Sequence, residues 1–117
     1  MNSATANVNG INMRWLEQGQ GLPLVLIHDI PTSPVLWRHV LPKLQGVRAL
    51  AFEMVGYGES IPEGEGRDIS VGQQAEYLIA WLDHLGIDRA ILAGHDLGGG
   101  VAHIAAVRYP ERCAGFS

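Results

Sequence analysis

The stretch that decides the fold is Ala90–Gly100, with the sequence AILAGHDLGGG. An apolar run typical of a strand ends at Gly94, and a run of small and apolar residues typical of a helix follows. The spacing Gly-x-Asp-x-Gly between them predicts a sharp turn with Asp96 at its centre. Such a turn needs a positive φ at Asp96, which is strained for any residue but glycine. Gly94 and Gly98 are expected because a Cβ at either position would clash with the crowded turn.

This turn would hold the Asp96 side chain clear of the backbone, at the N-terminus of the following helix. The helix dipole and the N–H groups there favour negative charge. The pattern is that of a nucleophile elbow with Asp in place of Ser, and a carboxylate at this point can attack an electrophilic carbon and form an ester. The alternative is that Asp96 only caps the helix, since Asp is a favoured N-cap residue. The two glycines at this spacing favour the nucleophile.

The composition of the 117 residues excludes several classes of protein. A net charge of −4 and a pI near 5.6 argue against a nucleic-acid partner. A single cysteine, Cys113, rules out an internal disulfide framework, and we expect it to be a buried, inert thiol. No apolar run reaches membrane-spanning length and no signal peptide is recognisable, so the prediction is a cytoplasmic protein without a membrane partner. The acidic residues of the segment 53–68 are expected on a solvated surface: Glu53, Glu59, Glu63, Glu65 and Asp68.

Strand and helix patterns alternate along the chain. Asn9-Gly10 predicts a hairpin turn, Ser70 and Gln73 form a capping-box pattern, and Gly86 is a C-cap. The expected strands are 5–8, 11–17, 22–27, 47–52 and 89–93 with a further one starting at 113, and the expected helices are 34–45, 71–85 and 97–109. This order predicts an α/β fold with a mostly parallel sheet and helices on both faces. Functional groups should then gather at the carboxyl ends of the strands, in loops 28–34, 53–60 and 94–98.

Five stretches carry a resemblance to a known family: HDIPTS at 28–33, LWR at 36–38, GYGES at 56–60, GHDLGG at 94–99 and YPER at 109–112. With them the chain resembles the α/β-hydrolase superfamily over nearly its whole length. It looks most like the Asp-nucleophile branch that holds haloalkane dehalogenases and epoxide hydrolases. The resemblance implies that residues 1–117 are the N-terminal part of the core domain. That part is a hairpin and three strand–helix units of a three-layer sandwich, without a cap domain or C-terminal half.

The resemblance also implies roles for individual residues. Asp96 would be the nucleophile, and the backbone N–H groups of Ile30 and Leu97 would form the oxyanion hole. The chain departs from the family pattern in three ways. Asp29 stands where glycine is usual and Glu53 where Asp is more common. Leu97 and Ile30 lack the side-chain N–H groups with which haloalkane dehalogenases hold the departing halide.

The family also needs a histidine base and an acid that orients it, and both come from beyond the last strand seen here. None of the five histidines is expected to be that base: His28, His39, His84, His95 and His103. The chain is therefore expected to be a fragment that cannot turn over substrate alone, acting on a small apolar electrophile such as an alkyl halide or an epoxide. No cofactor or metal is indicated. A nucleotide site is not expected at the glycines of 56–60, because neither a Lys-Ser/Thr pair nor a helix is expected after them.

Two further expectations follow from a half-domain. A strand edge and one sheet face would be left uncovered, which predicts self-association through the exposed sheet edge. The alternative function is a non-catalytic vestigial or interaction fragment of the same fold, whose elbow is only a relic. A serine-type esterase is disfavoured because residue 96 is Asp.

Overall fold

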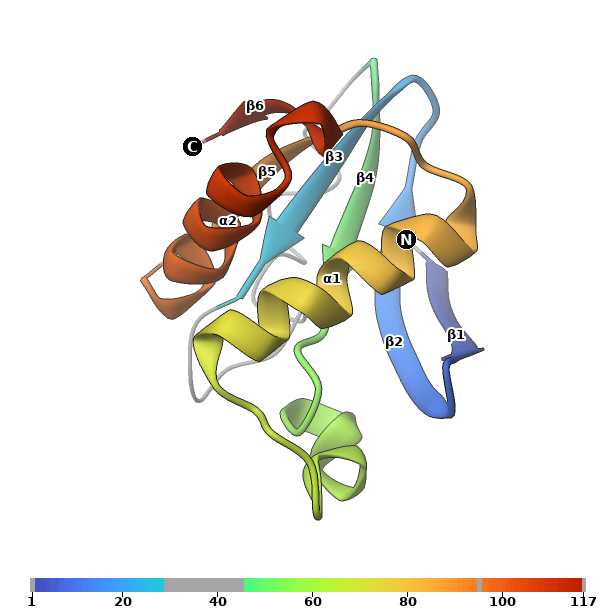
Figure 1. The fold of residues 1–117 in the computed structure, drawn as a ribbon. Helices are drawn as coiled ribbons and strands as arrows, with labels where there is room; N and C mark the ends of the chain where they lie inside the picture. Colours follow the sequence, from blue (N-terminus) through green and yellow to red (C-terminus); the bar gives the residue numbers. More distant parts are fainter. Residues whose placement is uncertain (1, 29–45, 95, 117) are drawn as a thin grey trace.

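The computed structural model describes residues 2–28, 46–94 and 96–116, and it contains a six-stranded sheet with helices α1 and α2 on one face (Figure 1). The strand order is β1-β2-β4-β3-β5-β6. The elements are β1 (Asn2–Val8), β2 (Ile11–Gln18), β3 (Leu22–Ile27), β4 (Val47–Phe52), the 3₁₀ helix η3 (Gly58–Gly64), α1 (Val71–Leu85), β5 (Ala90–Gly94), α2 (Leu97–Arg108), the 3₁₀ helix η4 (Pro110–Arg112) and β6 (Cys113–Phe116). The predicted α/β class is confirmed, whereas the helix expected at 34–45 lies outside the described residues.

The N-terminal hairpin has the predicted turn. Asn9 and Gly10 have φ of 52° and 87°, both positive as a type I′ turn requires, and β1 pairs antiparallel with β2 around them. Strand β2 then pairs antiparallel with β4, with Trp15 opposite Phe52. The hairpin is thus an antiparallel extension of a parallel sheet.

Strands β4, β3, β5 and β6 are parallel, and their register determines which loops meet. Ile27 at the end of β3 lies opposite both Phe52 of β4 and Gly94 of β5. The chain therefore leaves three neighbouring strands at one edge of the sheet, as expected for loops 53–60 and 94–98 and for His28.

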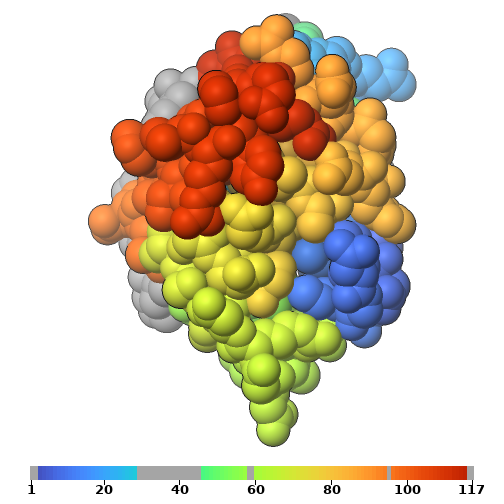
Figure 2. All heavy atoms as spheres, viewed as in Figure 1, coloured from blue at the N-terminus to red at the C-terminus, as the bar shows by residue number. Residues whose placement is uncertain are grey.

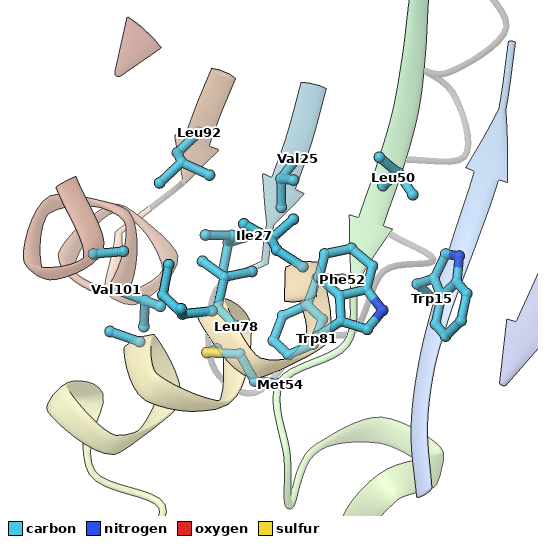
Figure 3. Packing of buried hydrophobic residues seen from close by; sticks show 14 of the residues in the cluster. Trp15, Val25, Ile27, Leu50, Phe52, Met54, Leu78, Trp81, Leu92 and Val101 are labelled. Atoms are coloured by element: carbon cyan, nitrogen blue, oxygen red, sulfur yellow. The ribbon is translucent and has the colours of Figure 1, made fainter. Parts of the chain in front are cut away.

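Both faces of the central strands are buried. On the helix side, Trp81 of α1 packs edge-on against Trp15 and lies 4.8 Å, centroid to centroid, from Phe52 (Figure 3). On this side α1 packs against α2 on one side and lies beside the hairpin on the other (Figure 2). A second buried cluster on the other face holds Leu26, Ala49 and Ala51. The expectation of an uncovered sheet face is therefore wrong for these three side chains, which are at most 5% exposed.

Helix α1 begins and ends as its sequence predicts, with one difference. The Ser70 hydroxyl accepts a hydrogen bond from the Gln73 N–H, and Gly86 ends the helix in the left-handed region with φ of 71°. The other hydrogen bond that a capping box predicts, from the Ser70 N–H to the Gln73 side chain, is wrong. The Ser70 N–H donates to Asp68 Oδ1 at 2.9 Å, because the carboxylate two residues upstream forms a tighter local turn.

The acidic segment 53–68, which follows β4, is not the exposed loop that the sequence predicts. It contains the 3₁₀ helix η3, and Glu53 at its start is only 5% exposed. The Ser60 hydroxyl donates to the Glu53 carboxylate, and Arg14 Nε lies 3.8 Å from the same oxygen, so the buried charge has partners. Glu63 is half-buried, and its carboxylate accepts a hydrogen bond from the Asn12 N–H.

The single cysteine, Cys113, was expected to be buried, but the structure shows it half-buried.

Candidate active site

The turn between β5 and α2 has the backbone expected of an elbow. Asp96 has φ of 56° and ψ of −111°, whereas an N-cap residue has extended angles like those of Ser70. Among the described residues, the Asp96 side chain accepts no capping hydrogen bond from α2, and it is exposed. The Asp96 carbonyl does begin the helix by accepting from the Gly100 N–H at 3.1 Å. The capping alternative therefore does not describe this carboxylate, which projects from a strained backbone.

Gly94 and Gly98 are required by close backbone packing. A Cβ on Gly94 would overlap the carbonyl group of Gly98, and a Cβ on Gly98 would overlap the carbonyl oxygens of Ile27 and His28. The elbow consequently rests directly on the exit of β3. This contact brings loop 94–98 against the start of the loop that contains the predicted oxyanion donor Ile30, which itself lies outside the described residues. Leu97, the other predicted donor, is the first residue of α2 and is half-buried.

The described histidines do not have the surroundings of a general base. His28 is fully buried, and its Nε2 accepts from the Met54 N–H at 2.9 Å, so its ring is neutral with the proton on Nδ1. This agrees with the expectation that His28 is not the base. His84 in the last turn of α1 and His103 on α2 are exposed. His39 and His95 lie outside the described residues, and so does Asp29.

The loop Glu53–Tyr57 lies at the same sheet edge and is held by a residue that the sequence patterns did not single out. The side-chain amide of Gln74, which is buried, accepts from the Val55 N–H at 3.0 Å and donates to the Val55 carbonyl at 2.6 Å. A signal was present in the sequence: Gln74 stands among Val71, Ala75 and Leu78 on the apolar stripe of α1, where a polar residue needs a partner.

No group of three metal-ligating side chains lies together among residues 2–28, 46–94 and 96–116. Within the same ranges, no helix is both long and apolar enough to span a bilayer. The site described so far is therefore a projecting carboxylate on a crowded turn, at the same sheet edge as the loop Glu53–Tyr57, which buried polar contacts hold in place.

Comparison with known proteins identifies the family to which this fold belongs. Residues 23–116 match the model of the family described as the alpha/beta hydrolase fold. The chain belongs to this family. The predicted resemblance is confirmed.

The relatives and solved structures include members of the predicted branch, epoxide hydrolases and haloalkane dehalogenases. The chain is 37% identical over 105 residues to bifunctional epoxide hydrolase 2 of Mus musculus, a match that covers 88% of this chain and 19% of that protein. It is 36% identical over 105 residues to a haloalkane dehalogenase of Agrobacterium fabrum, covering 88% of this chain and 34% of that protein. The crystal structure of a haloalkane dehalogenase loop variant from Bradyrhizobium elkanii superposes with a TM-score of 0.85 at 32% identity, covering 98% of this chain and 37% of that one. The chain thus spans from about a fifth to less than two fifths of the length of these proteins.

Proposed function

We propose that this α/β-hydrolase chain carries the nucleophile of an ester-forming hydrolase, and that the nucleophile is Asp96. The observation that carries the proposal is the backbone at Asp96, with φ of 56° and an exposed carboxylate that does not cap α2 among the described residues. Strain of this kind persists where the surroundings enforce it, and here Gly94 and Gly98 allow the packing that does so. A helix cap gives no reason for such an arrangement.

The proposed substrate is a small apolar electrophile, an alkyl halide or an epoxide, as the names of the haloalkane dehalogenase and epoxide hydrolase relatives suggest. With a halide, an Asp96 oxygen bonds to carbon while the carbon–halogen bond breaks and the halide leaves with the electron pair. With an epoxide, the carboxylate opens a ring carbon–oxygen bond, and the ring oxygen takes a proton from water. The Leu97 N–H, at the start of α2, is one proposed oxyanion donor and Ile30 the other.

Hydrolysis of the ester is proposed not to follow in this chain alone. The second step needs a base within hydrogen-bond reach of the attacking water. Among the described histidines, His28 is committed to the Met54 N–H, and His84 and His103 are exposed on helices. The ester should therefore accumulate on Asp96 rather than turn over.

Intact-protein mass spectrometry tests this proposal. After incubation with n-butyl bromide or butylene oxide, we expect one stoichiometric adduct on the wild-type chain, which peptide mapping assigns to Asp96. The variant Asp96→Ala should show none, and Glu65→Ala, which removes another exposed carboxylate, should react like the wild type. Folded protein that gives no adduct with either reagent, or an adduct that survives in Asp96→Ala, would overturn the proposal and favour the vestigial fragment.

A further inference from the structure

The loop that follows β4 has buried backbone groups whose hydrogen bonds come from side chains of other elements. Met54 and Val55 are 0% and 1% exposed. The Met54 N–H donates to His28 Nε2, and the N–H and carbonyl of Val55 are both satisfied by the amide of Gln74. A buried backbone group that loses its partner is costly, so these contacts hold the loop in one conformation.

The side-chain amide of Gln74 supplies both the acceptor and the donor that the two backbone groups of Val55 need. Gln74 is 1% exposed at the end of the first turn of α1, next to Ala75 and one turn from Leu78 in the main core. An apolar side chain of similar volume would fill the same space, but it would leave both backbone groups of Val55 buried without partners. The polar residue is therefore explained by the loop it binds rather than by packing of the helix.

The same contacts continue to the elbow. Strand β3 lies between β4 and β5, and His28, which binds Met54 through its ring, follows β3 directly. The carbonyl oxygen of His28 is one of the atoms on which Gly98 packs. A continuous path of contacts thus runs from Gln74 through Val55, Met54 and His28 to the turn that presents Asp96.

We infer that Gln74 is a positioning residue, which fixes the loop Glu53–Tyr57 and, through His28, the surface on which the Asp96 elbow rests. The inference rests on the proposed function of Asp96, but its first test needs no substrate. The Gly100 N–H, which donates to the Asp96 carbonyl, reports on the elbow itself.

Amide hydrogen exchange of the folded chain, measured by NMR, provides that test. In Gln74→Met we expect exchange of the Met54 and Val55 amides to accelerate by about tenfold or more, the scale of one lost hydrogen bond, and exchange of Gly100 to accelerate with them. The Tyr109 N–H, bound to Ala105 at the other end of α2, should exchange as before. The matched change Gln73→Met, at the neighbouring half-buried residue, should leave all four amides unaltered. Unchanged exchange at Gly100 in Gln74→Met would overturn the inference, because Gln74 would then serve the loop alone.

The rate of adduct formation on Asp96 with n-butyl bromide is the second measurement, made well below the unfolding temperature of each variant. Gln74→Met should react about tenfold more slowly than the wild type, since misplaced reacting groups lose rate steeply. Gln74→Glu keeps an acceptor for the Val55 N–H and should lie between the two. If Gly100 exchanges faster while the adduct rate stays the same, Gln74 does not position the nucleophile. A wild type that forms no adduct would refute the proposed function, and the exchange experiment would still decide whether Gln74 holds the elbow.

Discussion

The consecutive glycines at the start of α2 differ in what they contribute. A Cβ on Gly98 would overlap backbone atoms of Ile27 and His28. A Cβ on Gly100 would only reach Val71 Cγ1 at 3.5 Å, an ordinary contact, and the φ of Gly100 is not positive. Gly98 is thus needed for the elbow to rest on β3, whereas Gly100 weakens the first turn of its helix without a steric reason.

This difference predicts opposite effects of the same substitution. Gly98→Ala should lower the free energy of unfolding by about 1–3 kcal/mol, the usual cost of overpacking. Gly100→Ala should raise it by about 0.5–1 kcal/mol, because alanine loses less backbone entropy in a helix. Urea unfolding followed by circular dichroism measures both. Equal destabilisation by the two substitutions would contradict the assigned packing.

At the residue scale, sequence reasoning succeeded where the constraint is local. The strained angle of Asp96 followed from glycines two residues away on either side, so its spacing alone predicted it. The burial of Glu53 was not predictable in this way, because its partners are Ser60 and Arg14, and Arg14 reaches it from another strand. The amide of Gln74 likewise has its partner 19 residues away.

At the scale of elements, a polar contact joins the two helices on the sheet face. The Tyr109 hydroxyl donates to one Glu76 oxygen at 2.6 Å, and Arg108 Nη1 donates to the other at 2.9 Å and to the Gly72 carbonyl at 3.1 Å. The hydrogen bond from Tyr109, with a smaller contribution from Arg108, lowers the pKa of the Glu76 carboxyl from its usual range. The contact therefore stabilises the folded state more strongly when Glu76 is ionised than when it is protonated.

The pH dependence of stability should show this contact. Because the pKa of Glu76 is lower in the folded chain, the unfolded chain binds its proton first. The stabilisation is fully present above the ordinary glutamate pKa of about 4.3 and is lost as the pH falls through the lower folded value. Thermal unfolding between pH 3 and 6 should show a smaller decrease in Glu76→Gln than in the wild type. The control Glu65→Gln changes an exposed position, and its unfolding temperature should decrease as much as that of the wild type. If the unfolding temperature of Glu76→Gln also decreased as much as that of the wild type, the contact would not contribute to stability.

Most elements were predictable because their signals are periodic. Apolar runs gave β3 and β4 with the bounds found in the structure, and caps gave both ends of α1. The 3₁₀ helix η3 was not predicted, since its segment is polar and contains Pro62. It is held by contacts distant in sequence, such as the hydrogen bond from Asn12 N–H to Glu63.

At the scale of the whole molecule, the described sheet has two outer strands of different character. Strand β1 exposes Ser3, Thr5 and Asn7, which are polar. Strand β6 has the uncharged sequence CAGF and, within the described sheet, pairs with β5 alone. Its register slips between Ala90 and Ile91 of β5, so that Cys113 and Gly115 are paired and Ala114 is not. An uncharged outer strand of this kind is a template for pairing with another chain.

We therefore expect the chain to self-associate through β6 rather than through β1. Light scattering coupled to size-exclusion chromatography should give a mass above the 12.7 kDa of one chain, rising with concentration. Ala114→Lys places a charge at the exposed, unpaired position of β6 and should shift the population towards the monomer, since charged side chains protect sheet edges. Thr5→Lys makes the same change at an exposed position of β1 and should leave the association intact. A wild-type chain that stays a monodisperse monomer would refute self-association, whereas dissociation by Thr5→Lys alone would move the interface to the other edge.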